Sequence, residues 1–141
     1  MKQIVVSLLL TLFSIMTTQA ESNCCQSPEC AGIRAALDLY VQAAIQGDSK
    51  IARPTFAETA TISHVEGDTL ISLPIQALFD YYDQTGPHEA SYVIEECSVA
   101  GDVAIVRIES IFGSTEFSDM FTLAKDGENW KILSKVFHVK Q

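Results

Sequence analysis

A histidine faces the apolar side of a predicted strand. Polar and apolar residues alternate from Thr59 to Val65, as in a strand with one buried face. His64 falls on the same side as Ala60 and Ile62. A neutral imidazole accepts a proton near neutral pH, so His64 is a candidate general base. The alternative is a structural histidine or a pocket wall, which is the more frequent use of a lone inward histidine.

Two further side chains that could take part in a reaction lie among apolar residues. Asp119 alternates with Phe117 and Phe121, which predicts that it faces the interior. Tyr40 belongs to an apolar series at helical spacing between residues 33 and 45, so its ring is expected in the core with the hydroxyl at the rim. A tyrosine and a protonated aspartic acid both donate hydrogen bonds to an oxygen that gains negative charge.

The remaining histidines are weaker candidates. His138 shares a predicted strand face with Trp130 and would reach a pocket mouth or a subunit interface. A structural alternative pairs Asp119 with His64 or His138. His88 lies in a turn and is expected to be solvated. Because His64, His138 and Asp119 are far apart without a compact ligand motif, we expect no metal and no cofactor.

Periodicity predicts the elements that would position these residues. Helices are expected from 27 to about 46, briefly within 48–57, and from 74 to 86. Strands are expected over 59–64, 69–73, 89–99, 103–112, 116–124 and 130–139. Short turns join the later strands, so their pairing should be antiparallel. The predicted fold is α+β, with three helices on one face of an antiparallel sheet.

The strand predicted over 103–112 is apolar on both faces. Ile105 belongs to one face and Val106 to the other. An antiparallel sheet with one wet face should alternate more cleanly, so a second copy of the chain is expected to cover the outer face. Arg107 and Glu109 lie on the side of Ile105 and would pair across that contact.

The first twenty of the 141 residues are typical of a secretory signal peptide. Lys2 precedes the apolar run "IVVSLLLTLFSIM", and "TTQA" places small residues before a cleavage point after Ala20. We therefore expect a periplasmic or secreted protein without a membrane anchor. The expected mature chain comprises a cysteine-containing segment, 21–32, and one domain, 33–141.

The net charge and the cysteine content of the expected mature chain agree with an exported protein. Removing residues 1–20 takes away Lys2 and no acid, which changes the net charge from −9 to −10. Such a surface repels nucleic acid and anionic membranes. Cys24, Cys25, Cys30 and Cys97 are expected to form disulfides in an oxidising compartment, with three possible full pairings left open. A redox or metal role is the alternative.

Four fragments carry a resemblance to a known superfamily. They are "YVQAAIQGD", "FAETATISH", "FSDMFTLAKDGENWKI" and "SKVFHV". From about 33 to 139, the chain resembles the nuclear-transport-factor-like superfamily, which includes ketosteroid isomerase, scytalone dehydratase and the SnoaL-type cyclases. It looks most like the exported group named putative lumazine-binding proteins. The resemblance implies a cone, in which a curved sheet wraps a long first helix and leaves a pocket, and it implies dimers through the sheet.

The resemblance also implies roles for individual residues. Tyr40, Gly47-Asp48 and His64 match a helix tyrosine, its following Gly-Asp and the catalytic base of ketosteroid isomerase, and Asp119 matches a late-strand pocket aspartate. That isomerase combines an aspartate base with a tyrosine and a neutral aspartic acid, which donate hydrogen bonds to the reacting oxygen. This chain departs from that pattern because histidine replaces aspartate at the base position.

Three functions follow from these observations. The first is binding of a small and largely apolar ligand, with an aromatic one as a candidate, by a wall that comprises Tyr40, Phe56, His64, Phe79, Tyr82, Asp119 and Trp130. The second is a cofactor-independent isomerase, dehydratase or cyclase, with His64 as base and with Tyr40 and Asp119 as donors. The third is an assembly role in which the sheet face forms a dimer and the pocket is vestigial.

Overall fold

The structure is a computed structural model that describes residues 27–141. The helices are α1 (Pro28–Gln46), α2 (Ser49–Ala52) and α3 (Gln76–Thr85), with a 3-10 turn η2 (Arg53–Thr55). The strands are β1 (Phe56–Glu66), β2 (Thr69–Pro74), β3 (Ala90–Ala100), β4 (Val103–Phe112), β5 (Thr115–Asp126) and β6 (Asn129–Val139). The predicted signal peptide, Cys24 and Cys25 lie outside the described residues.

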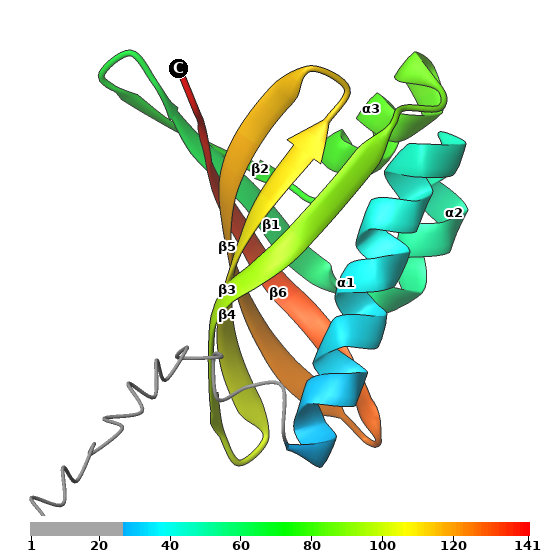
Figure 1. Cartoon of the computed structure of the whole chain (residues 1–141), viewed down its shortest axis with the longest axis vertical. Helices are drawn as coiled ribbons and strands as arrows, with labels where there is room; N and C mark the ends of the chain where they lie inside the picture. The colour runs from blue at the N-terminus through cyan, green and yellow to red at the C-terminus, as the bar shows by residue number, and fades with distance from the viewer. Residues whose placement is uncertain (1–26) are drawn as a thin grey trace, which may run out of the picture.

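All six strands form one curved sheet in the order β2-β1-β6-β5-β4-β3. The helices gather on its concave side, with α1 running along the sheet (Figure 1). The predicted α+β class and helix grouping are confirmed. The expectation of a wholly antiparallel sheet is wrong, because β1 pairs with β6 in parallel. The first hairpin is thus joined to the C-terminal strand, and the open sheet ends in β2 at one edge and β3 at the other.

Helix α1 has the predicted bounds for identifiable reasons. Pro28 occupies its first turn, where a missing backbone N–H is harmless. Gly47 ends it in the left-handed conformation, at a φ of 62°. A Cβ at Gly47 would lie 2.3 Å from the carbonyl carbon of Gly86, so this cap holds the loop after α3 against α1. The predicted short helix is shorter than expected, since Phe56 already belongs to β1.

A β-bulge in β6 changes which side chains face inward. Thr122 pairs with Ser134 and Leu123 with Ile132, which leaves Leu133 as an extra residue. Trp130 and Ile132 point inward before the bulge, and Lys135 and Phe137 point inward after it. His138 consequently lies exposed on the outer face. The prediction that it shares a face with Trp130 is wrong, because regular alternation stops at the bulge.

The outer face of the sheet exposes apolar side chains in this single chain. Ile105 is 61% exposed and Met120 is 57% exposed. Arg107 bonds to Glu109 and Glu96 of its own chain, with N–O distances of 2.5 and 3.0 Å. Arg107 thus has one partner on its own strand and one on β3, and its pairing with Glu109 across a subunit contact stays a prediction.

Candidate functional site

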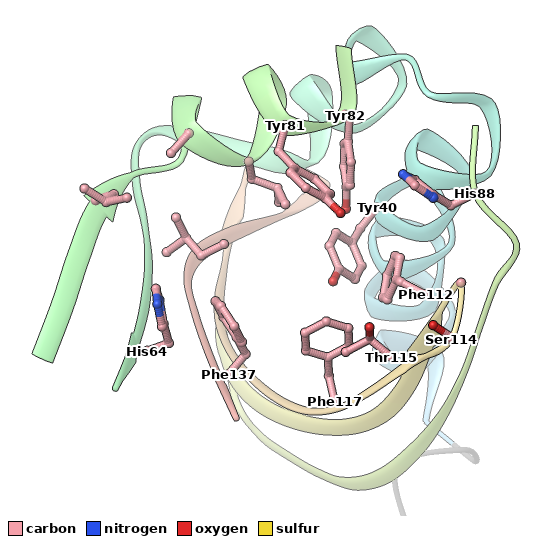
Figure 2. A pocket seen from close by; sticks show the side chains of 15 residues that line it. Tyr40, His64, Tyr81, Tyr82, His88, Phe112, Ser114, Thr115, Phe117 and Phe137 are labelled. Atoms are coloured by element: carbon pink, nitrogen blue, oxygen red, sulfur yellow. The ribbon is translucent and has the colours of Figure 1, made fainter. Parts of the chain in front are cut away.

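A cavity of about 600 Å³ opens between α3, α1 and the concave face of the sheet (Figure 2). Its position matches the open end expected from the cone resemblance. The residues that line it are Tyr40, Ile62, His64, Leu73, Ala77, Leu78, Tyr81, Tyr82, His88, Phe112, Gly113, Ser114, Thr115, Phe117 and Phe137. The lining is therefore mainly aromatic and aliphatic, with a few polar groups.

Four aromatic rings form one wall of this cavity, here called the aromatic floor: Tyr40, Phe112, Phe117 and Phe137. The centroids of Tyr40 and Phe112 are 5.7 Å apart, those of Phe112 and Phe117 are 5.9 Å apart, and those of Phe117 and Phe137 are 5.8 Å apart. These are ordinary distances for packed aromatic pairs. The floor thus presents a continuous apolar surface to anything inside the cavity.

His64 lies at the rim of the cavity, next to the floor. Its ring stacks on Phe137, with centroids 4.7 Å apart and planes inclined by 23°. The side chain is half-buried, and alternation along β1 had correctly predicted its inward orientation. Figure 2 shows Phe137 on the cavity side of the His64 ring, so the imidazole meets a ligand only near the mouth.

Tyr40 and Tyr82 bring two hydroxyl groups to the interior of the cavity. Both side chains are 2% exposed. Burial raises the pKa of Tyr40 well above its ordinary value, and the neighbouring Tyr82 raises it further. Burial likewise raises the pKa of Tyr82. Both phenols therefore remain protonated at neutral pH and can donate hydrogen bonds.

His88 lies in the cavity wall, which corrects its predicted place in a solvated turn. Its Nε2 is buried and has no hydrogen-bond partner. Its backbone N–H donates to the carbonyl of Ala44 on α1, at 3.0 Å, which turns the side chain inward. The sequence carried one signal for this, since Gly86 ends α3 and Pro87 prevents the helix from continuing before His88.

Asp119 does not line the cavity. It is 0% exposed and lies behind the aromatic floor. One carboxylate oxygen accepts from Ser110 Oγ at 2.5 Å, and the other pairs with Lys135 Nζ at 2.5 Å. Because both oxygens have partners, Asp119 has no free group to offer an enolate. The predicted pairing of Asp119 with His64 or His138 is also wrong, since its cation is Lys135.

Lys135 is the polar residue that sequence reasoning missed. It is 4% exposed, and its Nζ lies 4.2 Å from the ring centroid of Phe137 and 5.8 Å from that of Tyr40. Burial lowers the pKa of this lysine, and Asp119 opposes that shift. A buried carboxylate is stable only with a positive partner, so the predicted burial of Asp119 already implied a nearby cation. The bulge in β6 concealed which lysine supplied it.

The predicted wall residues divide into two groups. Tyr40, His64 and Tyr82 line the cavity. Phe56 and Phe79 pack edge to face in the core, with centroids 5.6 Å apart. Trp130 closes the opposite end of the fold, where its Nε1 donates to Glu29 at 3.2 Å. These three core residues do not line the cavity, so they would not contact a ligand in it.

Two further structural findings concern metals and membranes. Within residues 27–141, no three His, Cys, Asp or Glu side chains are grouped as a metal site would require. None of the helices in this part of the chain combines the length and apolar character needed to cross a membrane.

The chain matches a known family and known structures. Residues 28–138 match the family described as "Putative lumazine-binding". A curated relative, "Aldolase FrzH" from Cladobotryum sp, is 30% identical over 103 residues, which are 70% of this chain and 82% of the relative.

Solved structures share the fold. An NTF2-like protein of unknown function from Shewanella baltica has a TM-score of 0.75 and 34% identity, over 80% of this chain and 94% of that chain. A ketosteroid isomerase-like protein from Erwinia carotovora atroseptica has a TM-score of 0.64 and 18% identity, over 82% of this chain and 98% of that chain. The second likeness concerns the fold alone. The resemblance to the nuclear-transport-factor-like superfamily is thus confirmed.

Proposed function

The chain belongs to the family described as "Putative lumazine-binding", and from this premise we propose that it binds a small, largely apolar, aromatic molecule in the cavity. The observation that carries the proposal is the aromatic floor beside a volume of about 600 Å³. Ligand sites typically occupy about 300–1,000 Å³ and combine apolar walls with a few placed polar groups. Tyr40, Tyr82 and His64 are the predicted wall residues that would contact the ligand.

Native mass spectrometry of the protein purified from its own host tests this proposal. The wild type should carry a small molecule, and lumazine is the first compound to titrate because the family description names it. Ala77→Phe fills the cavity and should remove the bound mass, whereas Gln84→Phe, exposed on the same helix, should retain it. A wild type that binds nothing, or a bound mass that survives Ala77→Phe, contradicts the proposal.

The second candidate function is enzymatic: a cofactor-independent isomerase, dehydratase or cyclase with His64 as base. A relative named an aldolase favours it, because aldol reactions, like these, begin with proton removal beside a carbonyl. Tyr40 and Tyr82 would stabilise the resulting oxyanion. His64→Ala should then lower turnover by orders of magnitude with the fold intact, while the exposed His138→Ala should not. Equal turnover in both variants excludes His64 as the base.

Export of the chain, with cleavage of the signal peptide and disulfide formation, is part of the same proposal. Cleavage after Ala20 would release the chain to the periplasm or medium, and N-terminal sequencing should then begin at Glu21. The proposal includes a disulfide at Cys97, because disulfides form and persist in an oxidising compartment. A cellular protein that retains Met1 contradicts export.

A homodimer through the outer sheet face completes the proposal. The exposed side chains of Ile105 and Met120 support it, because they are diagonal neighbours on the outer face of β4 and β5. Met120→Asp should convert the dimer to a monomer in light-scattering measurements, while Val65→Asp, on the distant hairpin, should not. A wild-type monomer in dilute solution counts against both the dimer and an assembly role.

A further inference from the structure

Two buried polar atoms of residues 27–141 have no hydrogen-bond partner, and both belong to the cavity wall. They are Tyr82 Oη and His88 Nε2. The Tyr40 hydroxyl lowers the pKa of Tyr82 as a donated hydrogen bond would, but the O–H proton of Tyr82 itself has no acceptor. An unmade hydrogen bond on a buried group destabilises the protein, so each such group needs an explanation. The other buried polar side chains of the described chain have partners: Ser49, Thr55, Ser110, Asp119 and Lys135.

The two atoms come from elements that are held in place. Tyr82 lies on α3, and its carbonyl accepts from the backbone N–H of Gly86 at 3.1 Å. His88 lies in the loop that follows α3, and its backbone N–H donates to the carbonyl of Ala44 on α1. The ring of Tyr81 is parallel to that of His88 within 8°, at a centroid distance of 6.2 Å. Figure 2 shows these rings grouped on the α3 side of the cavity, opposite Phe117 and Phe137.

This arrangement divides the cavity into an apolar and a polar end. Phe117 and Phe137 offer only ring surface, whereas Tyr82 and His88 offer hydrogen-bonding atoms that the protein leaves unused. A phenol that stays protonated acts as a donor, and a neutral imidazole can donate from Nε2. Asp119, behind the floor, already has its partners and does not compete for this role.

We propose that Tyr82 and His88 form a binding subsite for the carbonyl oxygen of a flat, otherwise apolar ligand. Tyr82 Oη–H and His88 Nε2–H donate to that end of the molecule, and its rings lie against the aromatic floor. This subsite rests on the proposed binding function and names the chemical class of the ligand. It also explains why two buried polar groups remain unpaired beside a floor whose other side is fully paired.

Calorimetric titration with 1-tetralone and tetralin tests the subsite, because these bicyclic molecules differ by one carbonyl group. The wild type should bind 1-tetralone about tenfold more tightly, which corresponds to roughly one good hydrogen bond. Tyr82→Phe and His88→Leu should each reduce that preference. Tyr92→Phe is the matched control, because it deletes a tyrosine hydroxyl that donates to Asp38 outside the cavity lining, and it should keep the preference.

The outcomes separate this subsite from the wider proposal. Equal wild-type affinity for both compounds, or a preference that survives Tyr82→Phe and His88→Leu, overturns the subsite and leaves ligand binding intact. Absence of binding by either compound to the wild type counts against the proposed function and the subsite together.

Discussion

Two sets of buried polar groups lie on opposite sides of the aromatic floor, and they differ in how completely they are paired. Behind the floor, Asp119 holds Ser110 and Lys135 by short contacts. On the cavity side, Tyr82 Oη and His88 Nε2 have no partner. Burial is costly for both sets, but only the first recovers that cost within the chain. The first set therefore stabilises the fold, and the second is available to a ligand.

The largest effect should come from breaking the paired set. Lys135→Met leaves the Asp119 carboxylate buried without its cation and should lower the free energy of unfolding by about 3–5 kcal/mol. Chemical denaturation measures this loss. The double variant Lys135→Met with Asp119→Asn removes the stranded charge and keeps an acceptor for Ser110. It should therefore recover most of the stability, and a single variant as stable as the wild type would show that the pair is dispensable.

A matched pair of hydroxyl deletions compares the two sets directly. Ser110→Ala leaves one oxygen of Asp119 without its donor and should cost about 1–3 kcal/mol. Tyr82→Phe deletes a hydroxyl that has no partner, so the ligand-free protein should be equally stable or gain up to about 1 kcal/mol. Thermal and urea denaturation of both variants measure the difference. Equal losses would mean that Tyr82 has a structural role like that of Ser110.

The contrast between the two sets also marks the limit of sequence-based prediction. Helix and strand periodicity predicted α1, the late strands and the inward orientation of His64, because each of these is set by local spacing. Asp119 was correctly predicted to be buried, since it lies between Phe117 and Phe121. Its partner was not predicted, because a bulge at Leu133 reverses the alternation of β6 and brings Lys135 inward.

Long-range packing hid the other features of the site. The parallel pairing of β1 with β6 joins distant segments, and no local pattern specifies it. His88 enters the cavity because Gly47 and Gly86 bring its loop against α1. Phe79 and Trp130 looked like pocket residues because aromatic rings serve a core and a pocket equally well. Only the curvature of the sheet decides which of the two they join.

A contact between the exposed Asp83 and the buried Ser49 should give the smallest effect and sharpens the comparison. Asp83 accepts from the backbone N–H and from Oγ of Ser49, both at 2.8 Å, and so links α3 to α2. These hydrogen bonds lower the pKa of Asp83 below its ordinary value of 3.8. Because the folded-state pKa is the lower one, the contact stabilises the fold fully above that ordinary value. Its contribution is lost as the pH falls through the folded-state pKa.

Replacing Asp83 should therefore change how stability depends on acid. Asp83→Asn should flatten the decline of unfolding free energy in this acidic range, measured by urea denaturation at successive pH values. Asp80→Asn, on the same helix, is the matched control for loss of a charge. If both variants follow the wild-type decline, the contact between Asp83 and Ser49 contributes nothing to stability.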